Sequence, residues 1–133
     1  MMKKTRSLTA LLFTLFPAIS FAKNVTPDEF WQIEKAQQPL IIDVRTPEEF
    51  SKGHLANAIN IPFDQITTIE NYLTDKSKPI LLYCRSGRRA ELAENTLYTL
   101  GYKETFNGMS YQLLQKAKPK DEKLMSMNQN RLT

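Results

Sequence analysis

The chain has 133 residues, of which 41% are hydrophobic and 10% aromatic, a composition typical of one globular domain and not of a fibre, a disordered tail or a polytopic membrane protein. Its 18 basic and 14 acidic residues give a net charge of +4, but Lys3, Lys4 and Arg6 supply three of these charges ahead of the first acid, Asp28. Without residues 1–22 the balance is 15 to 14, or +1, so the body of the chain has no overall attraction for a nucleic acid, and we predict none as a partner.

Residues 1–22 have the pattern of a secretory signal peptide. A basic start is followed by an apolar stretch, and Ser20-Phe21-Ala22 places small residues at the two positions that leader peptidase recognises. The apolar stretch contains Pro17 and is shorter than the roughly 18–20 residues that span a bilayer, which argues against an uncleaved anchor. We therefore predict cleavage after Ala22, a periplasmic mature protein and no stable insertion in the membrane.

The body of the chain alternates between helical segments and short apolar strands. Thr26 and Thr46 each precede a proline and stand three residues before a glutamate, the capping-box pattern that opens a helix. In chain order we predict a helix over 27–37, a strand over 39–44, a short helix from 47 that Gly53 ends, a strand over 58–61, a helix over 63–73, a strand over 79–83, a helix over 88–100, a strand over 103–106 and a helix over 110–117. Residues 118–133 lack periodicity and are predicted to be a flexible tail behind a domain of residues 23–117.

Strands that alternate with helices over short connections predict parallel βαβ units. The expected fold is therefore α/β, with a mostly parallel sheet covered by helices on both faces. Ligands bind such sheets at the carboxyl ends of the strands, where the chain enters the next helix. Cys84 follows the strand over 79–83 directly and stands at such a point.

Cys84 is the one cysteine of the chain, which excludes an intramolecular disulfide and a multi-cysteine metal cage. It is therefore either a small buried side chain or the reactive group. The free amides at the start of a helix favour an anion, as do Arg85, Arg88 and Arg89, and Gly87 allows successive amides to point inward. This environment favours a thiolate and a nucleophilic role for Cys84.

Three motifs, in this order, resemble the rhodanese family of single-domain sulfurtransferases, and with the leader they are most similar to the small exported rhodaneses of the phage-shock type. They are IDVRTPEEF at 42–50, GHLANAINIP at 53–62 and CRSGRRA at 84–90, followed by LGY at 100–102, within a match that covers most of 26–114. The resemblance implies a three-layer rhodanese-like fold with a five-stranded parallel sheet, and a cysteine that cycles through a persulfide. The family usually has paired glycines before an aromatic residue near the end of the domain, whereas NGMSY at 107–111 has one glycine.

The resemblance also implies a small anionic donor similar to thiosulfate, with cyanide or a thiol, on a small molecule or a protein, as the acceptor. Sulfur transfer needs a thiolate that attacks an outer sulfur while an anion leaves, and it requires no metal or organic cofactor. The predicted nucleophile is Cys84, and the predicted substrate-binding residues are Arg85, Ser86, Gly87, Arg88 and Arg89.

Asp43 and Arg45 are secondary candidates at the end of the first predicted strand. They either face the cysteine loop or form an ion pair that holds the sheet edge to the next helix. We favour the ion pair for Arg45, because buried arginines usually pair bidentately with a carboxylate. His54 follows a helix-ending glycine, where a hydrogen bond to the turn is commoner than a role as catalytic base.

Two other functions stay open at the level of sequence. A cysteine-dependent phosphatase or arsenate reductase has the same strand-loop-helix geometry, but these enzymes carry an arginine at the sixth position after the cysteine. Here Ala90 has that position and Arg89 stands one place early. A non-enzymatic persulfide carrier or binding domain would use the same loop to hand sulfur to a protein partner. We expect the protein to be a monomer.

Overall fold

The computed structural model describes residues 9, 10, 12, 14 and 23–132, so the predicted leader lies almost entirely outside the described part of the chain. The described part forms one sheet in the order β2-β1-β3-β4, with every neighbouring pair parallel. The strands are β1 (Leu40–Asp43), β2 (Ala58–Asn60), β3 (Ile80–Cys84) and β4 (Thr105–Ser110). The predicted parallel α/β fold is confirmed.

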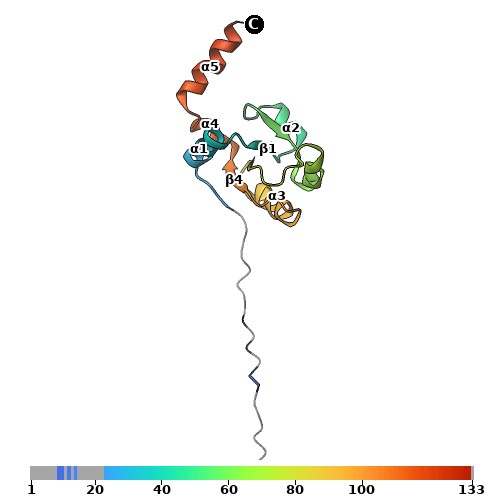
Figure 1. Cartoon of the computed structure of the whole chain (residues 1–133). Coiled ribbons are helices and arrows are strands. Elements are labelled where there is room, and N and C mark those ends of the chain that lie inside the picture. The colour runs from blue at the N-terminus through green and yellow to red at the C-terminus, as the bar shows by residue number, and fades with distance from the viewer. Residues whose placement is uncertain (1–8, 11, 13, 15–22, 133) are drawn as a thin grey trace, which may run out of the picture.

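Helices cover the sheet on both faces, which gives three layers. One buried cluster joins the sheet to α3 and η1, and the other joins it to α1 and α4. Figure 1 shows α1 and α4 close together, away from α3. The helical elements are α1 (Pro27–Gln37), α2 (Pro47–Ser51), the 3-10 helix η1 (Phe63–Asn71), α3 (Arg88–Thr99), α4 (Tyr111–Lys116) and α5 (Lys120–Arg131).

The central strand β3 supplies both clusters because successive side chains point to opposite faces of a sheet. Ile80, Leu82 and Cys84 enter the cluster with α3, whereas Leu81 and Tyr83 enter the cluster with α1. None of the five is more than 1% exposed. A strand buried on both faces needs apolar residues at every position. The continuous apolar run before Cys84 therefore predicts this strand correctly.

Both predicted capping boxes are confirmed. The Thr26 hydroxyl accepts a hydrogen bond from the Glu29 amide at 3.2 Å, and the Glu29 carboxylate accepts one from the Thr26 amide at 2.7 Å. Thr46 and Glu49 repeat this reciprocal pair at 3.2 and 2.9 Å. Each box satisfies amides that lack a partner within the first turn and so fixes where α1 and α2 begin.

The segment predicted as a helix over 63–73 is a 3-10 helix instead of an α-helix. Thr67 and Thr68 are β-branched and lower the preference for an α-helix. The buried residues of η1, Ile66 and Ile69, stand three positions apart, and a helix with three residues per turn puts such residues on the same side.

The predicted count of five strands needs correction. Four strands form in the described part of the chain, and beside β4 the N-terminal segment contributes only an isolated parallel bridge between Asn24 and Asn107. Pro27 opens α1 two residues after Val25, so the chain leaves the sheet before a strand can extend. The last strand also differs: it occupies Thr105–Ser110 instead of 103–106.

Most of the segment predicted as a flexible tail, residues 118–133, forms the helix α5, which projects from the body of the domain in Figure 1. Its apolar side chains Leu124, Met125 and Met127 are exposed. Lysine, leucine and methionine are good helix formers, so a helix can form here without the periodic apolar face that would have revealed it in the sequence. No helix in the described part of the chain is long and apolar enough to cross a membrane.

The first prediction concerns Gly108 in β4. A Cβ atom there would overlap the ring of Phe30 and lie 3.2 Å from Cδ1 of Leu114. Gly108→Ala should therefore lower the free energy of unfolding, measured in urea, by about 1–3 kcal/mol. Combining it with Phe30→Leu should cost less than the sum of the two single changes, because the smaller side chain makes room. Strict additivity would contradict this account of the packing.

Candidate active site

Cys84 is the last residue of β3, four residues before the first residue of α3, and it is 1% exposed. The backbone N–H of Gly87 donates a hydrogen bond to the Cys84 Sγ atom at 2.9 Å. Gly87 is the N-cap of α3 with a φ of 102°, in the left-handed region that favours glycine. A Cβ atom at Gly87 would also lie 2.6 Å from the Met109 sulfur. Both the backbone angle and the packing thus require glycine beside the thiol.

Asn107 holds the cysteine loop from the neighbouring strand β4. Its side-chain amide donates to the Gly87 carbonyl at 2.9 Å, and its side-chain oxygen accepts from the Met109 amide at 2.9 Å. Met109 has a φ of 67°, and the β3–β4 register shifts between Leu82 and Cys84. Met109 has the position at which the resemblance predicts the second glycine of the pair. It adopts the left-handed backbone conformation, and its side chain packs against Gly87.

The three arginines after Cys84 lie in different environments. Arg85 is exposed and lines a pocket. Arg89 is half-buried and makes a bidentate ion pair with Glu49 of α2, at 2.7 and 3.0 Å. Arg88 is exposed and is not among the residues that line this pocket. Of the three predicted arginines, Arg85 therefore lines the pocket, and Arg89 holds α2 against α3.

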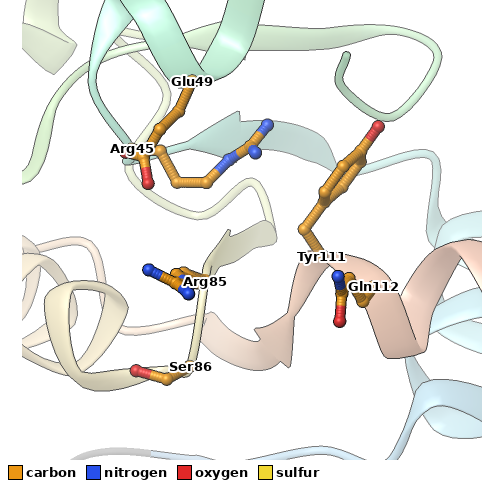
Figure 2. Close-up of a pocket in the computed structure, with 6 residues that line it drawn as sticks. All are labelled: Arg45, Glu49, Arg85, Ser86, Tyr111 and Gln112. Carbon is orange, nitrogen blue, oxygen red and sulfur yellow. The ribbon is translucent and has the colours of Figure 1, made fainter. Parts of the chain in front are cut away.

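The pocket has a volume of about 610 Å³. Its wall comes from the start of α2, the cysteine loop and the start of α4, as Figure 2 shows. The lining residues are Arg45, Glu49, Arg85, Ser86, Tyr111 and Gln112. Tyr111 and Gln112 are not among the predicted site residues, because no local sequence pattern indicates which end of a short helix contacts a loop about 25 residues earlier in the chain.

Arg45 forms the ion pair with Asp43 that the sequence favoured. Its Nε atom donates to Asp43 Oδ1 at 2.9 Å and its Nη2 atom to Oδ2 at 2.6 Å, and Nη2 also donates to the Gly53 carbonyl at 2.7 Å. The guanidinium lies 4.2 Å from the centre of the Tyr111 ring. Burial opposes the charge of Arg45, but the hydrogen bond and charge of Asp43 outweigh it and raise the pKa of the guanidinium. Arg45 thus forms part of the pocket wall, and the Asp43 carboxylate balances its charge.

His54 lies outside this arrangement. Its Nδ1 atom is 2.9 Å from the Phe50 carbonyl oxygen, and its ring stacks on the Phe50 ring at 3.7 Å between centres. It is not among the residues that line the pocket. Within the described part of the chain, no group of three or more His, Cys, Asp or Glu side chains is placed to hold a metal ion.

The second prediction concerns the pair between Glu49 and Arg89. The hydrogen bond from Arg89 lowers the pKa of Glu49 from 4.5 to about 2, against a smaller opposing effect of burial. Glu49→Gln should lower the free energy of unfolding by about 1 kcal/mol at neutral pH. Because the pKa of Glu49 is depressed in the folded state, this contribution is present above pH 4.5 and is lost as the pH falls towards 2.

Urea unfolding of the wild type and the variant at several pH values measures this difference. The matched control is Glu48→Gln, an exposed neighbour in the same helix, which should change stability little at any pH. A Glu49→Gln effect of constant size down to pH 2 would show that the ion pair does not stabilise the fold.

Comparison with known proteins places this arrangement in a family. A family model described as the rhodanese-like domain matches residues 26–108. A Schizosaccharomyces pombe protein named putative mitochondrial thiosulfate sulfurtransferase is 32% identical over 127 residues, which cover 80% of this chain and 89% of the relative. The Escherichia coli thiosulfate sulfurtransferase PspE is 36% identical over 91 residues, which cover 68% of this chain and 78% of PspE.

Solved structures agree. A structure described as rhodanese with anions from E. coli has a TM-score of 0.54 at 32% identity and covers 56% of this chain and 88% of its own. The human single-domain sulfurtransferase TSTD1 has a TM-score of 0.61 at 19% identity, covers 74% of this chain and 99% of its own, and shows the fold alone. From its sequence, its fold and the loop around Cys84, the chain belongs to the rhodanese-like family of sulfurtransferases.

Proposed function

We propose that the protein moves the outer sulfur of a thiosulfate-like donor, through a persulfide on Cys84, to cyanide or a thiol. The observation that carries this proposal is the hydrogen bond from the Gly87 amide to the Cys84 Sγ atom, at the N-terminus of α3 and next to a pocket that contains Arg85. Amide donors and the positive end of a helix stabilise a thiolate, and they stabilise an anionic persulfide in the same way.

The reaction has two displacement steps. The Cys84 thiolate attacks the outer sulfur of the donor, a bond forms between the two sulfurs, and sulfite leaves with the electron pair of the broken S–S bond. The acceptor then attacks the outer sulfur of the persulfide and releases the thiolate. Neither step needs a metal or an organic cofactor, because the transferred sulfur carries its oxidation state from donor to acceptor.

The charges around the pocket favour a small anion. Asp43 balances Arg45, and Arg89 balances Glu49. Arg85 is the pocket arginine for which the described part of the chain shows no carboxylate partner, so its charge is available to a donor. The low exposure of Cys84 favours a donor with a slim reactive end, such as the terminal sulfur of thiosulfate.

The ion pair with Glu49 also counts against a phosphatase or arsenate reductase. Those enzymes need an arginine that grips the oxyanion, at the sixth position after the cysteine. Arg89 stands at the fifth position, and both of its terminal nitrogens donate to Glu49. A persulfide carrier would share the first displacement step with the proposed enzyme and differ only in the acceptor.

We also propose that the protein acts in the periplasm after removal of residues 1–22. The basic start, the short apolar stretch and the small residues Ser20 and Ala22 support export and cleavage. A single cysteine suits this oxidising compartment, since it cannot be trapped in a wrong internal disulfide.

The third prediction concerns Cys84. Incubation with thiosulfate should add about 32 Da, one sulfur atom, to the intact protein, and cyanide should remove it. Cys84→Ser should show no mass gain and no transfer, because a hydroxyl cannot hold a transferable sulfur, and its circular dichroism should match the wild type. A mass gain on the serine variant would place the sulfur elsewhere. Phosphatase activity without sulfur transfer would favour the rival enzyme, and a persulfide that only a protein thiol discharges would favour a carrier.

The fourth prediction separates the loop arginines. Arg85→Ala should raise the KM for thiosulfate about five- to tenfold with a smaller change in kcat, because Arg85 attracts the donor in the ground state. Arg88→Ala is the matched control: it removes the same charge three residues further along, at the first position of α3 and outside the pocket lining, and should change KM less than Arg85→Ala. Equal effects of the two variants would show that the donor responds to overall charge and not to the pocket.

A further inference from the structure

Glu94 is a buried carboxylate that the proposed reaction does not use. It lies in α3 with 0% exposure and does not line the pocket near Cys84. Its Oε1 atom accepts hydrogen bonds from the Lys23 backbone nitrogen at 3.0 Å and from the Thr105 hydroxyl at 3.2 Å. Its Oε2 atom is buried and has no hydrogen-bond partner in the described part of the chain. A buried carboxylate oxygen without a donor is costly and needs an explanation.

The charge of Glu94 is poorly compensated in the unprocessed chain. Burial is the main cause that raises its pKa, and Glu91 of the same helix adds to it, whereas the hydrogen bonds from Lys23 and Thr105 and the charge of Lys23 act in the opposite direction. The Lys23 ammonium itself points elsewhere: it donates to the Lys103 carbonyl at 3.3 Å and lies 5.3 Å from the centre of the Phe106 ring. No side-chain cation therefore contacts the carboxylate in the described part of the chain.

The backbone of Lys23 is held in place beside β4. Its carbonyl accepts a hydrogen bond from the Asn107 amide at 2.8 Å, and the Val25 amide donates to the Asn107 carbonyl at 3.0 Å. These bonds flank the bridge between Asn24 and Asn107. They fix the position of the Lys23 nitrogen at Glu94, and this nitrogen belongs to the peptide bond at which the sequence predicts cleavage.

We propose that Glu94 is the binding site for the α-ammonium group of a processed chain that begins at Lys23. A peptidase hydrolyses the Ala22–Lys23 peptide bond. The products are a carboxylate on Ala22 and an α-amine on Lys23, which takes up a proton. The ammonium has three N–H donors where the peptide had one, so it can keep the bond to Oε1 and also supply Oε2. It brings the positive charge that the buried carboxylate lacks.

The inference rests on the proposed cleavage and makes it specific to one bond. Consecutive Cα atoms are about 3.8 Å apart, so cleavage one residue earlier or later would move the ammonium away from Glu94 by more than a hydrogen-bond length. Processing thus forms an ion pair between the new N-terminus, which is held beside β4, and Glu94 of α3. The mature protein should therefore be more stable than a chain with extra residues before Lys23.

The first experiment determines where the mature chain begins. The full chain is expressed with its leader and recovered from the periplasm, and its intact mass is measured. We expect a chain that begins at Lys23. A mature chain that begins at another residue would overturn the proposal, and it would leave the proposed sulfur transfer unaffected.

The second experiment tests the ion pair without relying on export. Chains that begin at Lys23 or at Ala22 are released from a removable fusion partner, each with Glu94 or with Glu94→Gln. Both buried clusters and the residues packed against them lie within 25–117, so all four chains retain the core. At pH 7 the chain that begins at Lys23 should have a Tm about 5 °C higher than the one that begins at Ala22, and Glu94→Gln should abolish this difference. Glu91→Gln, a change at an exposed position of the same helix, is the matched control and should preserve it.

The pH dependence gives an independent readout. An α-amino group has an ordinary pKa of about 7.7–8.0, and contact with Glu94 should raise it in the folded state. Over the pH range in which Glu94 stays ionised, the added stability should therefore be complete below about pH 7.7 and be lost as the pH rises through the higher folded value. If Glu94→Gln does not fold, acetylation of the Lys23 α-amine breaks the same ion pair by removing its positive charge. Equal Tm values for both starts, or a difference that survives both Glu94→Gln and acetylation, would overturn the proposal.

Discussion

The geometry of the site depends on one hydrogen bond, from the Gly87 amide to the Cys84 sulfur. It forms because β3 ends at Cys84 and Gly87, three residues later, turns the chain in the left-handed region directly before α3 begins at Arg88. Asn107 clamps the Gly87 carbonyl, and Met109 fills the space where a side chain at Gly87 would otherwise fit. The sheet, the bulged end of β4 and α3 together present a thiol to the positive end of a helix.

The arginines around this loop differ in whether a carboxylate balances their charge. Asp43 pairs with Arg45, which also donates to the Gly53 carbonyl just beyond α2, and Glu49 pairs with Arg89 and so joins α2 to α3. The arginines they hold are structural, even though one of them lines the pocket. Arg85 keeps its charge available. Fewer of these arginines are therefore free to attract an anion than the sequence suggests.

Local signals in the sequence predicted much of the fold and the position of Cys84 between β3 and α3. The apolar run before Cys84, the capping boxes at Thr26 and Thr46, and the glycine beside the cysteine each act through near neighbours in the chain. The pairing of Arg89 with Glu49, 40 residues away, and the clamp from Asn107 to Gly87, 20 residues away, depend on tertiary packing that no local pattern encodes. Likewise α5 escaped prediction because it has helix propensity without a buried face.

The central claim is that Cys84 takes sulfur in a step that is complete before any acceptor binds. Rapid mixing of the protein with excess thiosulfate in the absence of acceptor tests this claim directly, with the released sulfite quantified against the concentration of chains. We expect a burst of about one equivalent of sulfite per chain, which Cys84→Ser abolishes, followed by about one equivalent of thiocyanate when cyanide is added. Sulfite that appears only once the acceptor is present would contradict a persulfide intermediate and would mean that sulfur passes directly from donor to acceptor.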